Sequence, residues 1–159
     1  MKIDILTVGR IKEKFYSDAV DEYLKRLSRY AKVNVIEVKD EKTPDGAGET
    51  ENRIILVKEG ERLSKYLDES AYIIPLCIEG TQTDSEGFAD MITDLENKGV
   101  SHIQFIIGGS LGIDPDIKAK GKYKMSFSKM TFPHQLMRVI LLEQIYRAYR
   151  IKCNEPYHK

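Results

Sequence analysis

Strand-like and helix-like segments alternate along almost all of this sequence, and this alternation constrains the fold more than any other feature. Apolar runs that predict strands occupy residues 2–8, 33–38, 71–78, 102–107 and 122–127. Apolar side chains at helical spacing predict helices over 12–31, 49–67 and 84–98, with a short helical turn over 114–120. A long last helix begins at Pro133. Such a chain is expected to fold as one α/β sheet, rich in parallel strands, with helices on both faces.

The run from Ala71 to Ile78 is almost entirely apolar, which is typical of a central strand that is covered on both faces. Pro75 lies inside this run, and a proline has no N–H to donate to a neighbouring strand. We therefore predict that the strand ends or bends at Pro75 and leaves Leu76 and Cys77 at its exit.

The length of the chain, 159 residues, predicts a single domain over 1–159 with a genuine hydrophobic core. No run of about 18 apolar residues is present, so no segment predicts a membrane span. The first residues lack the apolar stretch and the small-residue cleavage site of a secretory signal peptide. We therefore expect the protein in the cytoplasm.

The charges of the chain are divided unevenly, although the formal net charge is +0. Residues 1–117 hold 15 Lys and Arg against 23 Asp and Glu, a net charge of −8. Residues 118–159 hold 10 Lys and Arg against 2 Glu, a net charge of +8. This division is compatible with a basic end that meets phosphates, and equally with charges that intermix on one folded surface.

A glycine turn follows the fourth predicted strand, in the stretch IIGGSLGID over residues 106–114. The spacing of Gly108, Gly109 and Gly112 does not match the dinucleotide fingerprint GxGxxG, and no GxxxxGKS or GxxxxGKT string exists in the chain. The turn is therefore either one wall of a ligand site or a simple tight turn.

Three loops leave the predicted strands at their carboxyl ends: at Leu76, after Ile107, and over 128–135. In an open α/β sheet, ligands bind at this edge. The residues therefore predict a cofactor or substrate pocket that is built from three loops, without identifying the ligand.

The three histidines do not have the spacing of metal ligands, so no metal site is expected. His102 opens a strand and is interpreted as structural, and His134 is expected to cap or pack in the first turn of the last helix. His158 differs from both, because it lies in a basic tail beside Tyr157.

Three segments together carry a resemblance to one family: IIGGSLGID, then SFSKMTFPHQLMRVILLEQIYRAYRI, then the terminal NEPYHK. Over essentially its whole length the chain resembles the RlmH family of SPOUT methyltransferases, which methylate N3 of a pseudouridine in 23S ribosomal RNA. The resemblance implies a SPOUT-type α/β fold with a C-terminal trefoil knot, which periodicity alone does not reveal. It also implies a homodimer, S-adenosyl-L-methionine as the cofactor, and 23S rRNA within the assembled ribosome as the partner.

The resemblance implies that the methyl donor contacts eight residues of the three loops: Leu76, Gly108, Phe127, Ser128, Lys129, Met130, Thr131 and Phe132. Apolar side chains would hold the adenine, and small residues would let the backbone approach the ligand.

The same resemblance implies catalytic roles for His158, Tyr157 and Arg147. His158 would assist loss of the N3 proton or hydrogen-bond the base, Tyr157 would stack on the base, and Arg147 would steady its negative charge. Arg138 and Lys159 would contact RNA, although members of the family often carry arginine rather than lysine after the tail histidine.

Two other functions stay open at this point. One is a SPOUT enzyme that acts on transfer RNA, and the other is a non-catalytic nucleotide- or RNA-binding α/β module. Binding of S-adenosylhomocysteine separates a cofactor protein from a plain RNA binder, and methyl transfer separates an enzyme from either.

Overall fold

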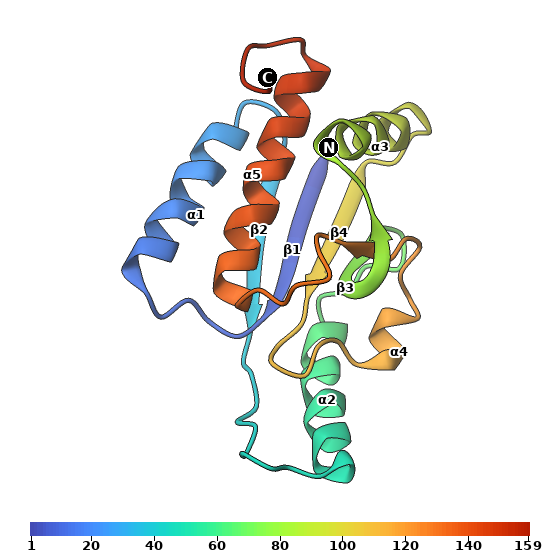
Figure 1. Cartoon of the computed structure of the whole chain (residues 1–159). Coiled ribbons are helices and arrows are strands. Elements are labelled where there is room, and N and C mark those ends of the chain that lie inside the picture. The colour runs from blue at the N-terminus through green and yellow to red at the C-terminus, as the bar shows by residue number, and fades with distance from the viewer.

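The computed structural model describes all residues from Met1 to Lys159 and contains one five-stranded sheet (Figure 1). Its strands are β1 (Lys2–Val8), β2 (Lys32–Val38), β3 (Tyr72–Gln82), β4 (His102–Ile107) and β5 (Met125–Ser126). They lie in the order β2-β1-β4-β3-β5, and each neighbouring pair is parallel. The predicted parallel α/β sheet is therefore confirmed.

Helices cover both faces of this sheet. The helices are α1 (Lys14–Leu27), α2 (Glu49–Ser64), α3 (Ser85–Asn97), α4 (Pro115–Lys118) and α5 (His134–Lys152). The larger apolar core joins the sheet to α1, α3 and α5, and a smaller one joins the other face to α2 and α4. Alternation along β1 makes this possible, because Ile3 and Ile5 belong to the first core while Leu6 and Val8 belong to the second.

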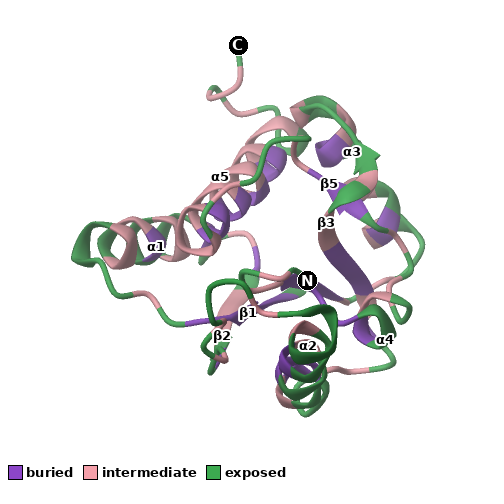
Figure 2. Ribbon diagram, turned by 60° about the horizontal axis from the view of Figure 1, so that its bottom comes forward, coloured by how far each residue is buried: buried purple, intermediate pink, exposed green.

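Helix α5 is the most deeply packed helix of the larger core. Leu141, Leu142 and Ile145 are completely buried between the sheet, α1 and α3. Figure 2 shows the buried part of α5, in purple, along one side of the helix. The opposite side is less covered, and Leu136, Val139 and Ile140 near its start remain half-buried. The position of α5 is thus fixed by its buried stripe, while part of its apolar surface stays in contact with solvent.

The third strand does not end at Pro75, because β3 continues to Gln82. Just beyond the proline, however, its pairing with β4 stops at Leu76 and its register with β5 shifts between Leu76 and Thr81. The carbonyl of Ile73 accepts a hydrogen bond from the Lys122 N–H, 2.8 Å away, on the side of the strand that faces away from β4. Residues two apart in a strand direct their backbone groups to the same side, so the nitrogen of Pro75 also faces away from β4. Gly121 packs there against the proline ring, where no N–H is needed.

The strand predicted over 122–127 is also shorter than expected. Only Met125 and Ser126 pair with β3, and the register shifts between Leu76 and Thr81. A Cβ on Gly80 would lie 2.6 Å from the backbone of Met125, so β3 passes too close to β5 for a side chain there. The chain before and after β5 is consequently free to form loops at the edge of the sheet.

Candidate functional site

A cavity of about 810 Å³ lies beyond the carboxyl ends of β3 and β4. It is lined by three segments, 76–79, 107–113 and 126–137, together with Lys118. These segments correspond to the three loops that the sequence predicts at this edge, and parallel strands bring them together because their carboxyl ends share one edge. The volume falls within the range of sites that hold a small molecule or a cofactor, roughly 300–1,000 Å³.

The structure brings seven of the eight residues assigned to the methyl donor to this cavity. They are Leu76, Gly108, Phe127, Ser128, Met130, Thr131 and Phe132. The eighth, Lys129, does not line the cavity and is exposed between two residues that do. Leu76, Phe127 and Phe132 also pack against the larger core, which holds the apolar part of the cavity in place.

The glycine turn forms one wall of the cavity through its backbone. A Cβ on Gly108 would lie 2.4 Å from both the carbonyl carbon and the carbonyl oxygen of Gly112. Gly112 has φ +86, and its N–H donates to the carbonyl of Gly109 at 3.0 Å. Only glycine fits at Gly108 because of space and at Gly112 because of its positive φ.

A buried carboxylate supports this turn from behind. Both oxygens of Glu59 lie about 3.3 Å from where a Cβ of Gly109 would be, and the side chain is almost fully buried. Glu59 Oε2 accepts a hydrogen bond from the Glu41 N–H at 2.9 Å, while Oε1 has no partner. Burial raises the pKa of Glu59, since water no longer stabilises its charge.

Local hydrogen bonds shape the loop after β5. The Ser126 hydroxyl donates to the carbonyl of Ser128, and the Ser128 hydroxyl accepts from the Met130 N–H, each at 3.0 Å. This turn leaves the side chain of Met130 outside, with 74% of its surface exposed. The loop therefore presents an apolar side chain at the mouth of the cavity.

Arg138 lies in the interior, which corrects its predicted role as an RNA contact. Its side chain is 0% exposed. Nη1 donates to Glu37 Oε2 at 2.6 Å, and Nη2 donates to the Gly9 carbonyl at 3.1 Å. A guanidinium that is enclosed in this way ties the ends of β1 and β2 to the start of α5, and it cannot reach a phosphate.

His134 lines the cavity, a role that the sequence analysis missed. Its Nδ1 lies 3.1 Å from Nη2 of Arg138, and because arginine has only donors, Nδ1 must be the acceptor. Burial and the charge of Arg138 lower the pKa of His134. The ring is therefore held neutral with its proton on Nε2. The signal in the sequence was its place between the loop at 128–133 and the last helix.

The tail forms a cluster with the last half of α5. Arg147 donates to Glu143 Oε1, and Nη1 of Arg147 lies 3.2 Å from Nδ1 of His158. The Tyr157 hydroxyl donates to the same Glu143 oxygen at 3.0 Å. The structure therefore brings the three predicted catalytic residues together and adds Glu143, which the sequence analysis did not select.

The ring of Tyr157 is already engaged in this cluster. The guanidinium of Arg147 lies 4.7 Å from its centroid, and the ring of Tyr146 lies 4.9 Å away. Burial, followed by the hydrogen bond to Glu143, raises the pKa of Tyr157 to about 12. The phenol is thus uncharged at neutral pH and acts as a donor. Lys159 follows at the exposed end of the chain.

The tail cluster and the cavity lie at opposite ends of α5. His134 begins the helix at the cavity, whereas Figure 1 shows the C-terminus beyond its far end. Arg147 stands 13 positions further along, which corresponds to about 20 Å at a rise of 1.5 Å per residue. The three predicted catalytic residues of one chain therefore lie far from the cavity of the same chain.

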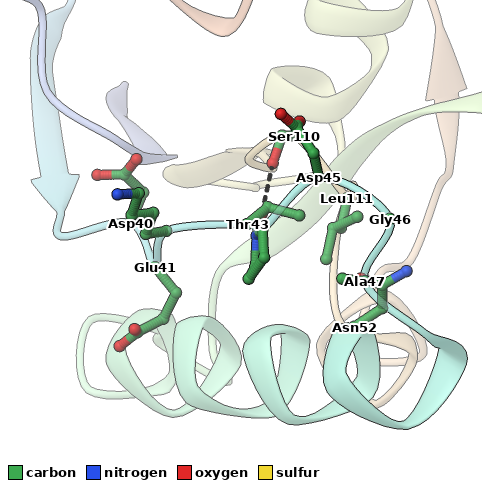
Figure 3. Close-up of a pocket in the computed structure, with 11 residues that line it drawn as sticks. Asp40, Glu41, Thr43, Asp45, Gly46, Ala47, Asn52, Ser110 and Leu111 are labelled. Atoms are coloured by element: carbon green, nitrogen blue, oxygen red, sulfur yellow. Dashed lines mark hydrogen bonds between the residues drawn. The ribbon is translucent and has the colours of Figure 1, made fainter.

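A second hollow of about 610 Å³ adjoins the glycine turn (Figure 3). The connection between β2 and α2 forms its other wall and contributes Asp40, Glu41 and Asp45. Thr43 and Ser110 share a hydrogen bond of 3.1 Å across it. The region beside the turn is thus acidic, in contrast to the apolar cavity.

Two further observations bear on the class of site. No three His, Cys, Asp or Glu side chains converge in the way that metal ligands do. None of the helices combines the length and apolar character that crossing a bilayer requires.

The fold and the cavity define a doubly wound α/β protein with a hollow of cofactor size at the carboxyl edge of its sheet. Residues 1–158 match the model of a family described as predicted SPOUT methyltransferase. The chain therefore belongs to the SPOUT methyltransferase family, as the resemblance implied.

Curated relatives match the whole chain. A protein named ribosomal RNA large subunit methyltransferase H from Bifidobacterium adolescentis is 59% identical over 159 residues, which is 100% of both chains. Proteins of the same name from Clostridium novyi and Clostridium botulinum are 55% and 54% identical over the same full length.

A solved structure supports the fold. A probable methylase family protein from Haemophilus influenzae superposes with a TM-score of 0.58 at 11% identity, covering 99% of this chain and 70% of that chain. At this identity the likeness concerns the fold alone.

Proposed function

We propose that this chain is an S-adenosyl-L-methionine-dependent methyltransferase that methylates N3 of a pseudouridine in 23S ribosomal RNA. The observation that carries the proposal is the cavity at the carboxyl edge, whose lining includes seven of the eight residues that the family resemblance assigns to the methyl donor. The names of the full-length relatives support ribosomal RNA of the large subunit as the substrate. The enzyme would act in the cytoplasm on the assembled ribosome.

The residues of the cavity fit this cofactor. The backbone cradle at Gly108 leaves space that any Cβ would fill, and Leu76, Phe127 and Phe132 offer an apolar slot of the kind that an adenine ring requires. The C-terminal trefoil knot of SPOUT proteins would hold these three loops together, and it remains a prediction of the family resemblance.

When bound, S-adenosylmethionine supplies an electrophilic methyl group on a sulfonium centre, and the protein must orient the nucleophilic nitrogen. Since Arg147 donates to Nδ1 of His158, the neutral ring carries its proton on Nε2 and can donate to a carbonyl oxygen of the base. Arg147 adds positive charge that favours the deprotonated base. Glu143 accepts the hydrogen bonds that Arg147 and Tyr157 donate.

A homodimer would bring the tail of one chain to the cavity of the other. The separation of about 20 Å along α5 requires a second copy if the tail takes part in the reaction. Leu136, Val139 and Ile140 provide a half-buried apolar face on α5 for such a contact. Light scattering is expected to show a dimer at micromolar concentration, and a monomer there would contradict this arrangement.

A mixed dimer tests whether the site is built from two chains. We expect homodimers of Gly108→Ala and of His158→Ala each to lose most of their turnover, the first through the cavity and the second through the tail. A purified dimer with one subunit of each kind joins one intact cavity to one intact tail, so about half of the wild-type activity should return. Turnover is measured as methyl transfer at a cofactor concentration that just saturates the wild-type enzyme.

Two results would contradict this prediction. A mixed dimer as inactive as its parents would mean that each site is built within one chain. Unchanged turnover of the His158→Ala homodimer would remove His158 from catalysis.

Transfer of tritiated methyl groups to ribosomes from a strain that lacks this protein tests the function itself. We expect label in 23S RNA, and loss of the label when the substrate ribosomes come from a strain that expresses the protein. Label in transfer RNA would favour a SPOUT enzyme of other specificity. Binding of S-adenosylhomocysteine without transfer to any RNA would favour a non-catalytic module.

A further inference from the structure

Exposed lysines lie near the cavity, and the family resemblance implies a role for only one of them, Lys129. Segment 118–124, KAKGKYK, has a lysine at every second position, and Lys129 follows in the loop after β5. Lys118 is paired with Glu79, and the ammonium of Lys122 lies 5.8 Å from the ring centroid of Tyr72, at the start of β3 and away from the cavity. Lys120, Lys124 and Lys129 are exposed and form no ion pair. We call Lys120, Lys124 and Lys129 the lysine rim.

The lysine rim is continuous with the cavity. Lys129 stands between Ser128 and Met130, both of which line it. Lys118 lies on the cavity wall and donates a hydrogen bond to Glu79, which lowers the pKa of that carboxyl group. The charge of Lys124 contributes to the same shift more weakly. The positive charges therefore act on the mouth of the cavity rather than on a remote part of the surface.

Apolar side chains lie at the same mouth. Met130 is 74% exposed and Ile78 is 50% exposed, and both line the cavity. Two exposed apolar side chains next to lysines without ion pairs are chemically complementary to single-stranded RNA. Such RNA offers the flat apolar face of a base beside charged phosphates.

The opposite side of the glycine turn has the reverse charge. Asp40, Glu41 and Asp45 surround the hollow that Figure 3 shows beside Ser110. These carboxylates repel phosphates, so RNA that reaches the cavity is directed to the other side. This division agrees with the net charge of −8 over residues 1–117 and locates part of the excess positive charge of 118–159 at the cavity.

We propose that the lysine rim is the surface on which phosphates of the substrate RNA dock, with Ile78 and Met130 contacting a base at the mouth of the cavity. This inference rests on the proposed function and deepens it, because it assigns RNA binding to the rim in place of the buried Arg138. Phosphate contacts made by lysine position the RNA and make its binding depend on salt.

The variant Lys120→Glu/Lys124→Glu tests the rim. The matched control combines Lys58→Glu on α2 with Lys65→Glu just after this helix, since these lysines are also exposed and without ion pairs. Binding of a 23S RNA fragment is measured over a range of salt concentrations, together with the KM and kcat of methyl transfer. Calorimetry with S-adenosylhomocysteine checks that the cavity is intact.

For the rim variant we expect RNA affinity to fall and KM to rise by about tenfold or more, with kcat and S-adenosylhomocysteine affinity unchanged. The slope of log affinity against log salt should become shallower by about 0.7–0.9 for each lost phosphate contact. The control pair should keep the wild-type KM and slope.

Wild-type affinity and salt slope in the rim variant would overturn the inference, even if the enzyme methylates RNA. An equal loss in the control pair would overturn it as well, because the effect would then follow net charge rather than position. Lysine-dependent RNA binding without methyl transfer by the wild-type protein would refute the proposed function and leave the rim as an RNA-binding surface.

Discussion

Replacing Gly108 with alanine is expected to weaken binding of S-adenosylhomocysteine by at least 100-fold, measured by calorimetry. The new methyl group would lie 2.4 Å from the backbone of Gly112, which cannot move aside as a flexible side chain would. The turn must then shift, and it forms one wall of the cavity. A displacement of about 1 Å in a binding site is enough for an effect of this size.

Gly48→Ala is the control for this substitution, because a Cβ on Gly48 meets nothing within 4 Å and Gly48 lies away from the cavity. Circular dichroism establishes that both variants fold. Affinity of the folded Gly108→Ala protein within twofold of wild type would contradict the assignment of the cavity to the cofactor.

Replacing Arg138 with methionine is expected to lower the free energy of unfolding by roughly 1–3 kcal/mol, the range for buried polar groups that lose a hydrogen-bond partner, since Glu37 is 35% exposed and water can reach its charge. The substitution leaves Glu37 without its cation, and it leaves the Gly9 carbonyl without that donor. Urea unfolding measures the change. Arg53→Met on the exposed side of α2 is the control and should change stability by less than about 0.5 kcal/mol.

A double-mutant cycle with Glu37→Gln separates the energy of the Arg138–Glu37 ion pair from that of the other contacts of Arg138. Glu37→Gln alone leaves the charge of Arg138 enclosed without a counterion, so its own cost should be large. The combined variant should lose less stability than the two single changes added together, since the pair is already broken by either one. Additive losses would mean that Arg138 stabilises the protein through packing alone.

The parallel sheet and the three-loop cavity could be predicted from the sequence because both follow from local pattern. Alternating strands and helices determine which ends of the strands meet, and the glycine turn follows its strand directly. The rule for Pro75 failed because it considers the proline alone. Whether β3 can continue through Pro75 depends on which side of the strand pairs with a neighbouring strand at that position, and this depends on where β5 lies in the sheet.

The environment of Arg138 could not be predicted from local pattern. Its partner Glu37 is 101 positions away, and nothing near Arg138 in the sequence indicates that its charge is enclosed. The same applies to His134, which acquires its tautomer from Arg138 and its place in the cavity from the loop before it. For Glu143, the contact with Tyr157 depends on how the tail turns back along α5.

The 19 residues of α5 have a consequence for how this chain can vary. Because the helix begins at the cavity and ends at the tail, it acts as a ruler between two halves of the proposed composite site. One inserted residue would advance the tail by about 1.5 Å and rotate it by about 100° around the helix axis. In a symmetric pair this error would occur twice, once for each cavity. Loops elsewhere can lengthen, but this helix must keep its length.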